Sequence, residues 1–135
     1  MDNKAYDIVI IGAGASGLAA GITALEKAPG SRVVIIEKKD VPGKKICATG
    51  NGRCNLTNTA CPGYIETLKF FDRAGVLTRT EEGGRVYPYS GDAKDIRDAL
   101  VSKFKSLSGE IVTGSPVTEV VPVATGAQGD RKSVV

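Results

Sequence analysis

The chain has 135 residues, of which 41% are hydrophobic and 24% charged, with a formal net charge of +3; these values are ordinary for one soluble globular domain. Histidine is absent, which excludes a Ser-His-Asp triad and a Cys-His dyad within this sequence. Aromatic residues make up 5% and there is no tryptophan, so little surface could stack on bases and we expect no nucleic-acid partner.

The cysteines and the first residues bear on location. Cys47, Cys54 and Cys61 stand at equal spacings that fit neither a secreted disulfide framework nor a zinc site, so we expect no metal. The start, MDNKAYDIVIIG, lacks the basic region and long apolar run of a signal peptide. No stretch approaches the roughly 18 apolar residues of a membrane span. These features predict a cytoplasmic protein with no membrane partner.

Residues 1–37 predict a nucleotide-binding βαβ unit. Tyr6–Ile11 is almost continuously apolar and β-branched, which is typical of a parallel strand buried on both faces. A glycine-rich turn leads into an Ala/Leu-rich helix that ends at Pro29-Gly30. Arg32–Ile36 is the second predicted strand, and Glu37 closes it.

The turn carries the spacing GxGxxG at Gly12, Gly14 and Gly17. The first glycine permits a sharp turn, the second lets a pyrophosphate approach the backbone, and the third lets helix and strand pack closely. Free N–H groups of the first helical turn, where Ala15 and Ser16 lie, would face the phosphates. Glu37 would accept hydrogen bonds from a ribose. The spacing alone leaves NAD and FAD open, and a glycine turn without a ligand is the alternative.

A glycine- and asparagine-rich loop spans residues 38–63, a length that is usually functional or disordered. Its TGNGRCN segment predicts a backbone nest at Gly50, Asn51 and Gly52. Arg53 either faces an anion or is solvated, and Asn55 either caps a turn or bonds a flavin edge. Two free thiols at Cys47 and Cys54 are favoured over a redox-active pair, although the spacing permits a disulfide.

Residues 64–121 predict the elements that complete a partial domain over residues 1–125. The pattern indicates a helix over Ile65–Ala74, a turn or hairpin around Gly83-Gly84, and a helix over Ser90–Leu107 with Asp92 as its N-cap. Two strands are expected, at Glu110–Thr113 and Val117–Val121. Tyr87 and Tyr89 are interpreted as packed hairpin residues rather than substrate contacts, and residues 122–135 as an irregular tail.

The segments DIVIIGAGASGLAA and VIIEKKDVPGKKICATGNGRCNLTN resemble a family of bacterial flavoproteins. This family is often labelled NAD(P)/FAD-dependent oxidoreductases and has aminoacetone-oxidase-like and bile-acid-reductase-like members. GGRVYPYSGDAKDIRDAL and SPVTEV are similar to it too. The resemblance implies an α/β fold with a Rossmann-like, glutathione-reductase-type FAD-binding βαβ domain. Because family members are far longer, it also implies a truncated chain.

The resemblance further implies where FAD would lie. Its pyrophosphate would occupy the loop at residues 12–17, Glu37 would hold the ribose beside Lys38, and Lys45 would lie on the pyrophosphate side. Val117 would offer its backbone to the adenine. The remaining cofactor residues would border the isoalloxazine ring; they are Gly50, Gly52, Arg53, Cys54 and Asn55.

Three functions therefore stay open. The chain is interpreted first as the FAD-binding portion of a flavin-dependent oxidoreductase, with no catalytic side chain assigned, whose partner is a small-molecule substrate or NAD(P)H. It could instead be a noncatalytic or incomplete nucleotide-binding fragment. The third alternative is a thiol-disulfide reductase that uses Cys47 and Cys54.

Overall fold

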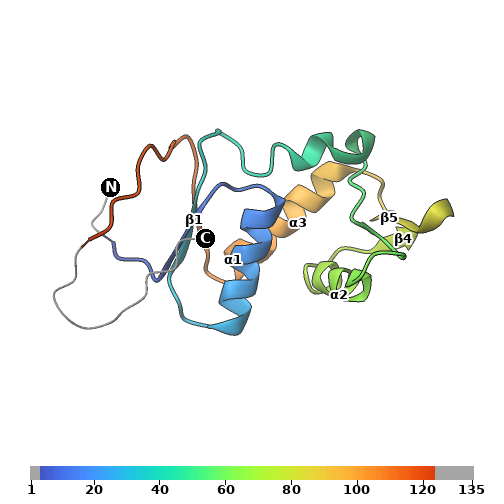
Figure 1. The fold of residues 1–135 in the computed structure, drawn as a ribbon, viewed down its shortest axis with the longest axis horizontal. Coiled ribbons are helices and arrows are strands. Elements are labelled where there is room, and N and C mark those ends of the chain that lie inside the picture. Colours follow the sequence, from blue (N-terminus) through green and yellow to red (C-terminus); the bar gives the residue numbers. More distant parts are fainter. Residues whose placement is uncertain (1–3, 124–135) are drawn as a thin grey trace.

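A computed structural model describes residues 4–123 of the chain. Its first sheet is parallel, with strand order β1-β2-β6 (Figure 1). β1 (Ile8–Ile11) and β2 (Val33–Ile36) are joined through α1 (Ala15–Lys27), which confirms the predicted βαβ unit. β6 (Glu110–Val112) pairs with the other edge of β2 and confirms the strand that was expected after residue 109.

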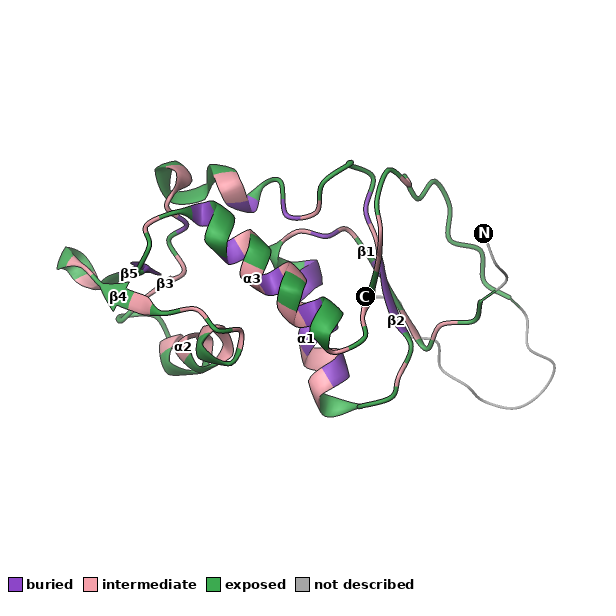
Figure 2. Cartoon of the chain, turned by 180° about the vertical axis from the view of Figure 1, so that it is seen from behind, coloured by how far each residue is buried: buried purple, intermediate pink, exposed green. Residues whose placement is uncertain are grey.

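Two helices cover one face of this sheet and form the core with it. α3 (Ala93–Ser106) packs beside α1, and the buried residues of both helices face one another (Figure 2). Phe104 is fully buried against Gly21, where an added Cβ would lie 2.7 Å from Cε2 of the ring. Glycine at this position therefore lets the two helices approach closely. Asp92 caps α3 as expected, because its Oδ1 accepts a hydrogen bond from the Lys94 N–H at 2.8 Å.

A second, antiparallel sheet lies at the other end of the helices, with strand order β3-β5-β4 (Figure 1). It contains β3 (Thr57–Asn58), β4 (Thr78–Thr80) and β5 (Arg85–Pro88). β4 and β5 form the predicted hairpin through the 3₁₀ turn η2 (Glu82–Gly84), in which Gly83 has a φ of +75°. α2 (Tyr64–Arg73) packs against β3 and β4. No helix within residues 4–123 is long and apolar enough to cross a membrane.

Two expectations about the strands are wrong. Val117–Val121 forms no strand and is irregular and exposed. No strand of the described residues pairs with it, and Pro116, which precedes it, lacks the N–H that a β-ladder needs. β1 is not buried on both faces, since Val9 is 37% and Ile11 46% exposed whereas Ile10 is 4% exposed. The two helices cover only the face of β1 that carries Ile10. The predicted irregular tail lies, from residue 124 onward, outside the described residues.

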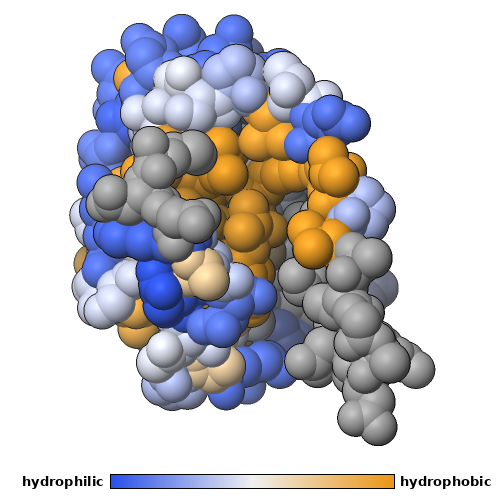
Figure 3. All heavy atoms as spheres, turned by 90° about the vertical axis from the view of Figure 1, so that its left-hand side faces the viewer, coloured by the Kyte–Doolittle hydropathy of each residue, from blue (hydrophilic) through white to orange (hydrophobic). Residues whose placement is uncertain are grey.

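The sheet face that the two helices leave uncovered is apolar and partly exposed. Val9 pairs in register with Val34, and Ile11 pairs with Ile36, so all four side chains lie on the face opposite the helices. On this face Val9 and Ile11 are exposed, whereas Val34 is buried at 2% exposure. Figure 3 shows apolar side chains gathered on this side of the molecule.

Candidate cofactor site

The glycine loop joins the carboxyl end of β1 to the start of α1. Gly12 has a φ of +101°, and its N–H donates to the Ile36 carbonyl at 2.8 Å. The first helical hydrogen bond runs from the Leu18 N–H to the Gly14 carbonyl at 2.9 Å. The N–H groups of Ala15, Ser16 and Gly17 therefore precede the helical hydrogen-bond ladder and are available to an anion at the helix N-terminus.

Gly14 and Gly17 are glycines for different physical reasons. A Cβ on Gly17 would lie 2.0 Å from the Gly12 oxygen and 3.4 Å from Cγ2 of Ile10. Helix α1 can therefore begin this close to β1 only with glycine at position 17. A Cβ on Gly14 would meet no protein atom within 4 Å. The space in front of Gly14 is open, as the approach of a ligand to the backbone requires.

Glu37 is held in place at the carboxyl end of β2. Its Oε2 accepts the Ala13 N–H at 2.7 Å and its Oε1 accepts the Lys39 N–H at 2.8 Å. The Lys39 bond, together with the Ala13 bond and the charge of Lys38, lowers the pKa of this 9%-exposed carboxyl below its ordinary value, against the opposing effect of burial. Each oxygen of an ionised carboxylate can accept a further hydrogen bond. Glu37 could therefore still receive hydroxyl groups of a ribose.

A cavity of about 570 Å³ opens in front of these groups. The segment after Pro42 closes one side of it, because the Gly43 N–H donates to the Ala13 carbonyl at 2.7 Å. Four lysines and one glutamate give its wall a net positive charge, which suits a diphosphate. The lining residues are Ala13, Gly14, Glu37, Lys38, Lys39, Val41, Gly43, Lys44, Lys45 and Ala48.

The predicted nest lies in the loop that follows the cavity wall. The 3₁₀ segment η1 (Ile46–Gly52) contains consecutive left-handed residues, with φ of +55° at Gly50 and +54° at Asn51. Cys54 is also left-handed, with φ of +57°, and its N–H donates to the Thr49 carbonyl at 3.0 Å. This stretch contacts α3 beside the second sheet (Figure 1).

Arg53 is bound to the hairpin rather than free. Its guanidinium carbon lies 4.1 Å from the centroid of the Tyr87 ring, and its Nη2 donates to Oε1 of Glu81. Sequence reasoning missed Glu81, because this residue stands 28 positions away from Arg53 and no local pattern marks it. Tyr87 is 7% exposed whereas Tyr89 is 66% exposed, so the interpretation as a packed tyrosine fits only Tyr87.

The cysteines and Asn55 are the other polar residues of interest in this loop, and Cys47 and Asn55 bind other groups of the protein. All three cysteines are free thiols, and Nη1 of Arg97 donates to Sγ of Cys47 at 3.6 Å. The Asn55 amide, with its nitrogen facing the second sheet, donates to the carbonyls of Thr57 at 2.9 Å and Val86 at 3.2 Å. A redox role for Cys47 and Cys54 stays a prediction.

The structure separates the predicted cofactor residues into groups. Gly14, Glu37, Lys38 and Lys45 line the cavity, and the rest of the glycine loop adjoins it. Gly50 and the four other flavin-side residues form the loop beyond Ala48. Val117 is 37% exposed and does not line the cavity. Residues 112–115 instead meet the site through their backbone, since the Glu37 N–H donates to the Val112 carbonyl at 2.8 Å.

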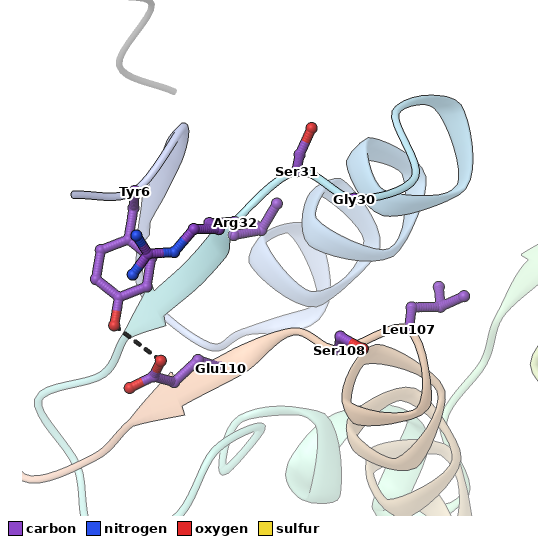
Figure 4. Close-up of a pocket in the computed structure, with 8 residues that line it drawn as sticks. Tyr6, Gly30, Ser31, Arg32, Leu107, Ser108 and Glu110 are labelled. Carbon is purple, nitrogen blue, oxygen red and sulfur yellow. Dashed lines mark hydrogen bonds between the residues drawn. The ribbon is translucent and has the colours of Figure 1, made fainter. Parts of the chain in front are cut away.

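A second cavity, of about 240 Å³, lies at the amino ends of the same strands (Figure 4). There the Tyr6 hydroxyl donates to Oε2 of Glu110 at 2.8 Å, and the Arg32 guanidinium lies over the Tyr6 ring. Ligands of open α/β sheets bind at the carboxyl ends of the strands, whereas this cavity lies at the amino ends. We therefore interpret its contacts as structural, holding the first residues of the strands together. The lining residues are Tyr6, Gly30, Ser31, Arg32, Val33, Leu107, Ser108 and Glu110.

Known proteins with similar sequences were found for this chain. Residues 6–67 match the HI0933-like protein Rossmann domain. The chain is 38% identical to the 3-dehydro-bile acid delta(4,6)-reductase of Clostridium scindens, over 92% of this chain and 36% of that protein. It is 47% identical to the ribosomal RNA dihydrouridine synthase of Escherichia coli, over 45% of this chain and 14% of that protein. The chain thus spans little more than a third of the first relative's length.

The fold has solved counterparts as well. The crystal structure of Thermovibrio ammonificans THI4 superposes with a TM-score of 0.65 at 24% identity, over 81% of this chain and 38% of that one. The open space at Gly14, the close packing at Gly17 and the positive wall all fit a dinucleotide diphosphate. With the match over residues 6–67, the chain contains the FAD-binding Rossmann domain of the HI0933-like flavoproteins, a fold of flavin-dependent oxidoreductases.

Proposed function

We propose that this chain provides the FAD-binding portion of a flavin-dependent oxidoreductase and holds the adenosine diphosphate half of FAD in the cavity at Gly14. One observation carries the proposal. The open backbone at Gly14, the fixed carboxylate of Glu37 and four lysines face the same cavity.

Each group would meet a different part of the cofactor. The N–H groups at the start of α1 would donate to the diphosphate, where the helix dipole also favours negative charge. Lys44 and Lys45, which line the same cavity, would offset that charge. Glu37 would accept the ribose hydroxyls and would repel a 2′-phosphate, so FAD or NAD is favoured over NADP at this site.

The flavin end would extend toward the Gly50–Asn55 loop, which continues from the cavity wall at Ala48. FAD supplies hydride chemistry when it is bound, while the protein binds and orients it. We propose a small-molecule substrate or NAD(P)H as the electron partner, because the flavin exchanges electrons with a second compound. We propose the cytoplasm as the location.

Binding of three nucleotides to the full chain tests the proposal. If the cavity holds the adenosine diphosphate half, FAD and ADP should bind and FMN should not, because FMN lacks the adenosine. Flavin fluorescence can follow FAD and FMN, and calorimetry can follow ADP. Gly14→Val should abolish binding of FAD and ADP, while Val9→Thr on the uncovered sheet face is the matched control and should bind normally. Equal affinity for FMN and FAD would refute the assignment.

A further inference from the structure

One acidic side chain next to the hairpin β4–β5 contacts the Gly50–Asn55 loop. Oε1 of Glu81, which directly follows β4, accepts a hydrogen bond from Nη2 of Arg53 and also pairs with Nη2 of Arg79 at 3.0 Å. One carboxylate therefore lies between two guanidinium groups. Arg53 belongs to the loop and Arg79 to the hairpin, so Glu81 connects the two segments.

The Arg53 side chain has little room to move once Glu81 holds it. One side of its guanidinium faces the Tyr87 ring at 4.1 Å, and Tyr87 is almost fully buried in β5. The backbone is fixed as well, since the Arg53 N–H donates to the Gly50 carbonyl at 3.1 Å. The Tyr87 ring also lies close to Gly50, 3.6 Å from where a Cβ would stand. Arg53 and Tyr87 therefore pack together against the left-handed turn at Gly50 and stabilise its position.

The hydrogen bond between Glu81 and Arg53 shifts the pKa of each side chain so that its charged form is favoured. The hydrogen bond from Arg53 is the main cause that lowers the pKa of Glu81; burial opposes it, and the charges of Arg53 and Arg79 lower the pKa further. The same bond raises the pKa of Arg53. Both side chains are about a third exposed, at 36% and 31%, so solvent screens the pair and it adds little to global stability. Its main effect is then on where the loop lies.

We propose that Glu81 is a positioning residue, which holds the Gly50–Asn55 loop through Arg53 so that the flavin end of the cofactor site is formed before FAD binds. The inference rests on the proposed function, because it takes this loop as the flavin side of the site. It assigns Arg53 to the support of the loop rather than to an anion.

The test compares FAD with ADP in the full chain. Because Glu81 acts only at the flavin end, Glu81→Gln should raise the dissociation constant for FAD about three- to fivefold, the range of a partly exposed ion pair. The dissociation constant for ADP should stay within about twofold. Glu82→Gln changes the adjacent exposed glutamate and should alter neither value. Thermal unfolding of each variant without ligand checks that the fold is retained.

A double-mutant cycle makes the role of Arg53 explicit. If Glu81 acts through Arg53, the FAD affinity of Arg53→Gln/Glu81→Gln should equal that of Arg53→Gln alone. Additive losses would overturn the proposal, and so would an equal loss of FAD and ADP affinity in Glu81→Gln or an unchanged FAD affinity. If wild-type protein bound neither FAD nor ADP, the proposed function itself would fail. That outcome is distinct from a change in the FAD-to-ADP ratio.

Discussion

Gly17→Ala should destabilise the protein although alanine is the better helix former. The new Cβ would lie 2.0 Å from the Gly12 oxygen and 3.1 Å from its carbonyl carbon. Neither backbone segment can move away freely. The Gly12 N–H is bonded to Ile36 in β2, and the first helical bond runs from the Leu18 N–H to Gly14. Relief of the overlap must therefore shift the start of α1 away from β1.

The size of the effect follows from two opposing contributions. Alanine gains about 1 kcal/mol over glycine in a helix interior. Overpacking of a filled site costs about 1–3 kcal/mol, and a backbone atom at this distance places the cost at the upper end. We expect a net loss of about 2 kcal/mol in the free energy of unfolding. For a chain of this size that lowers the unfolding midpoint by about 6–10 °C.

Gly14→Ala is the matched control for this prediction. Its Cβ would meet no protein atom within 4 Å and its φ is −79°, so stability should change by less than about 0.5 kcal/mol. Urea and thermal unfolding of the ligand-free full chain, followed by circular dichroism, measure both variants. The reasoning is refuted if Gly17→Ala unfolds at or above the wild-type midpoint, or if both variants lose the same stability. FAD affinity should fall in Gly14→Ala, whose methyl group occupies the ligand space.

Three further predictions concern residues away from the glycine loop. Ile10→Ala should lose about 2–4 kcal/mol in urea unfolding and Ile11→Ala less than about 1, because only Ile10 is buried; equal losses would mean that both faces of β1 are covered. The folded-state pKa of Glu37 lies below its ordinary value of 4.5, so its stabilising effect is present at neutral pH and lost as the pH falls below about 4.5. The unfolding free energy of Glu37→Gln should therefore fall less steeply with acidification than that of the wild type, and parallel curves would contradict this. Asp92→Ala should cost about 1 kcal/mol through loss of the N-cap, whereas Asp95→Ala in the first turn should cost only a few tenths.

The features that could be predicted from the sequence depend on residues close together in the chain. The βαβ unit follows from two apolar runs separated by glycines and a helix, and Asp92 caps α3 through a residue two positions away. The hairpin at Gly83 follows from local turn chemistry in the same way. In each case the interaction that defines the feature lies within the segment, so the local pattern contains the information.

The missed features depend on partners that are distant in the sequence. Nothing near Arg53 marks Glu81 as its partner, and nothing in the apolar run of β1 tells which face the helices will cover. The valines after Pro116 have a strand-like composition, but a strand forms only where a neighbour offers its hydrogen bonds. The expectation of burial on both faces rests on a nearly continuous apolar, β-branched run, and that composition does not depend on what packs against the sheet.

Helix α3 shows why the cofactor site needs residues beyond the family match at 6–67. Phe104 packs on Gly21 and so fixes the position of α1, whose first turn faces the cavity. One turn from the other end of α3, the Arg97 stem packs on Gly43, where a Cβ would lie 2.6 Å from Cγ of Arg97. Gly43 in turn bonds Ala13 in the glycine loop. Both walls of the cavity are therefore held by the same helix, and a protein limited to residues 6–67 would keep the glycine spacing without the packing that shapes the site.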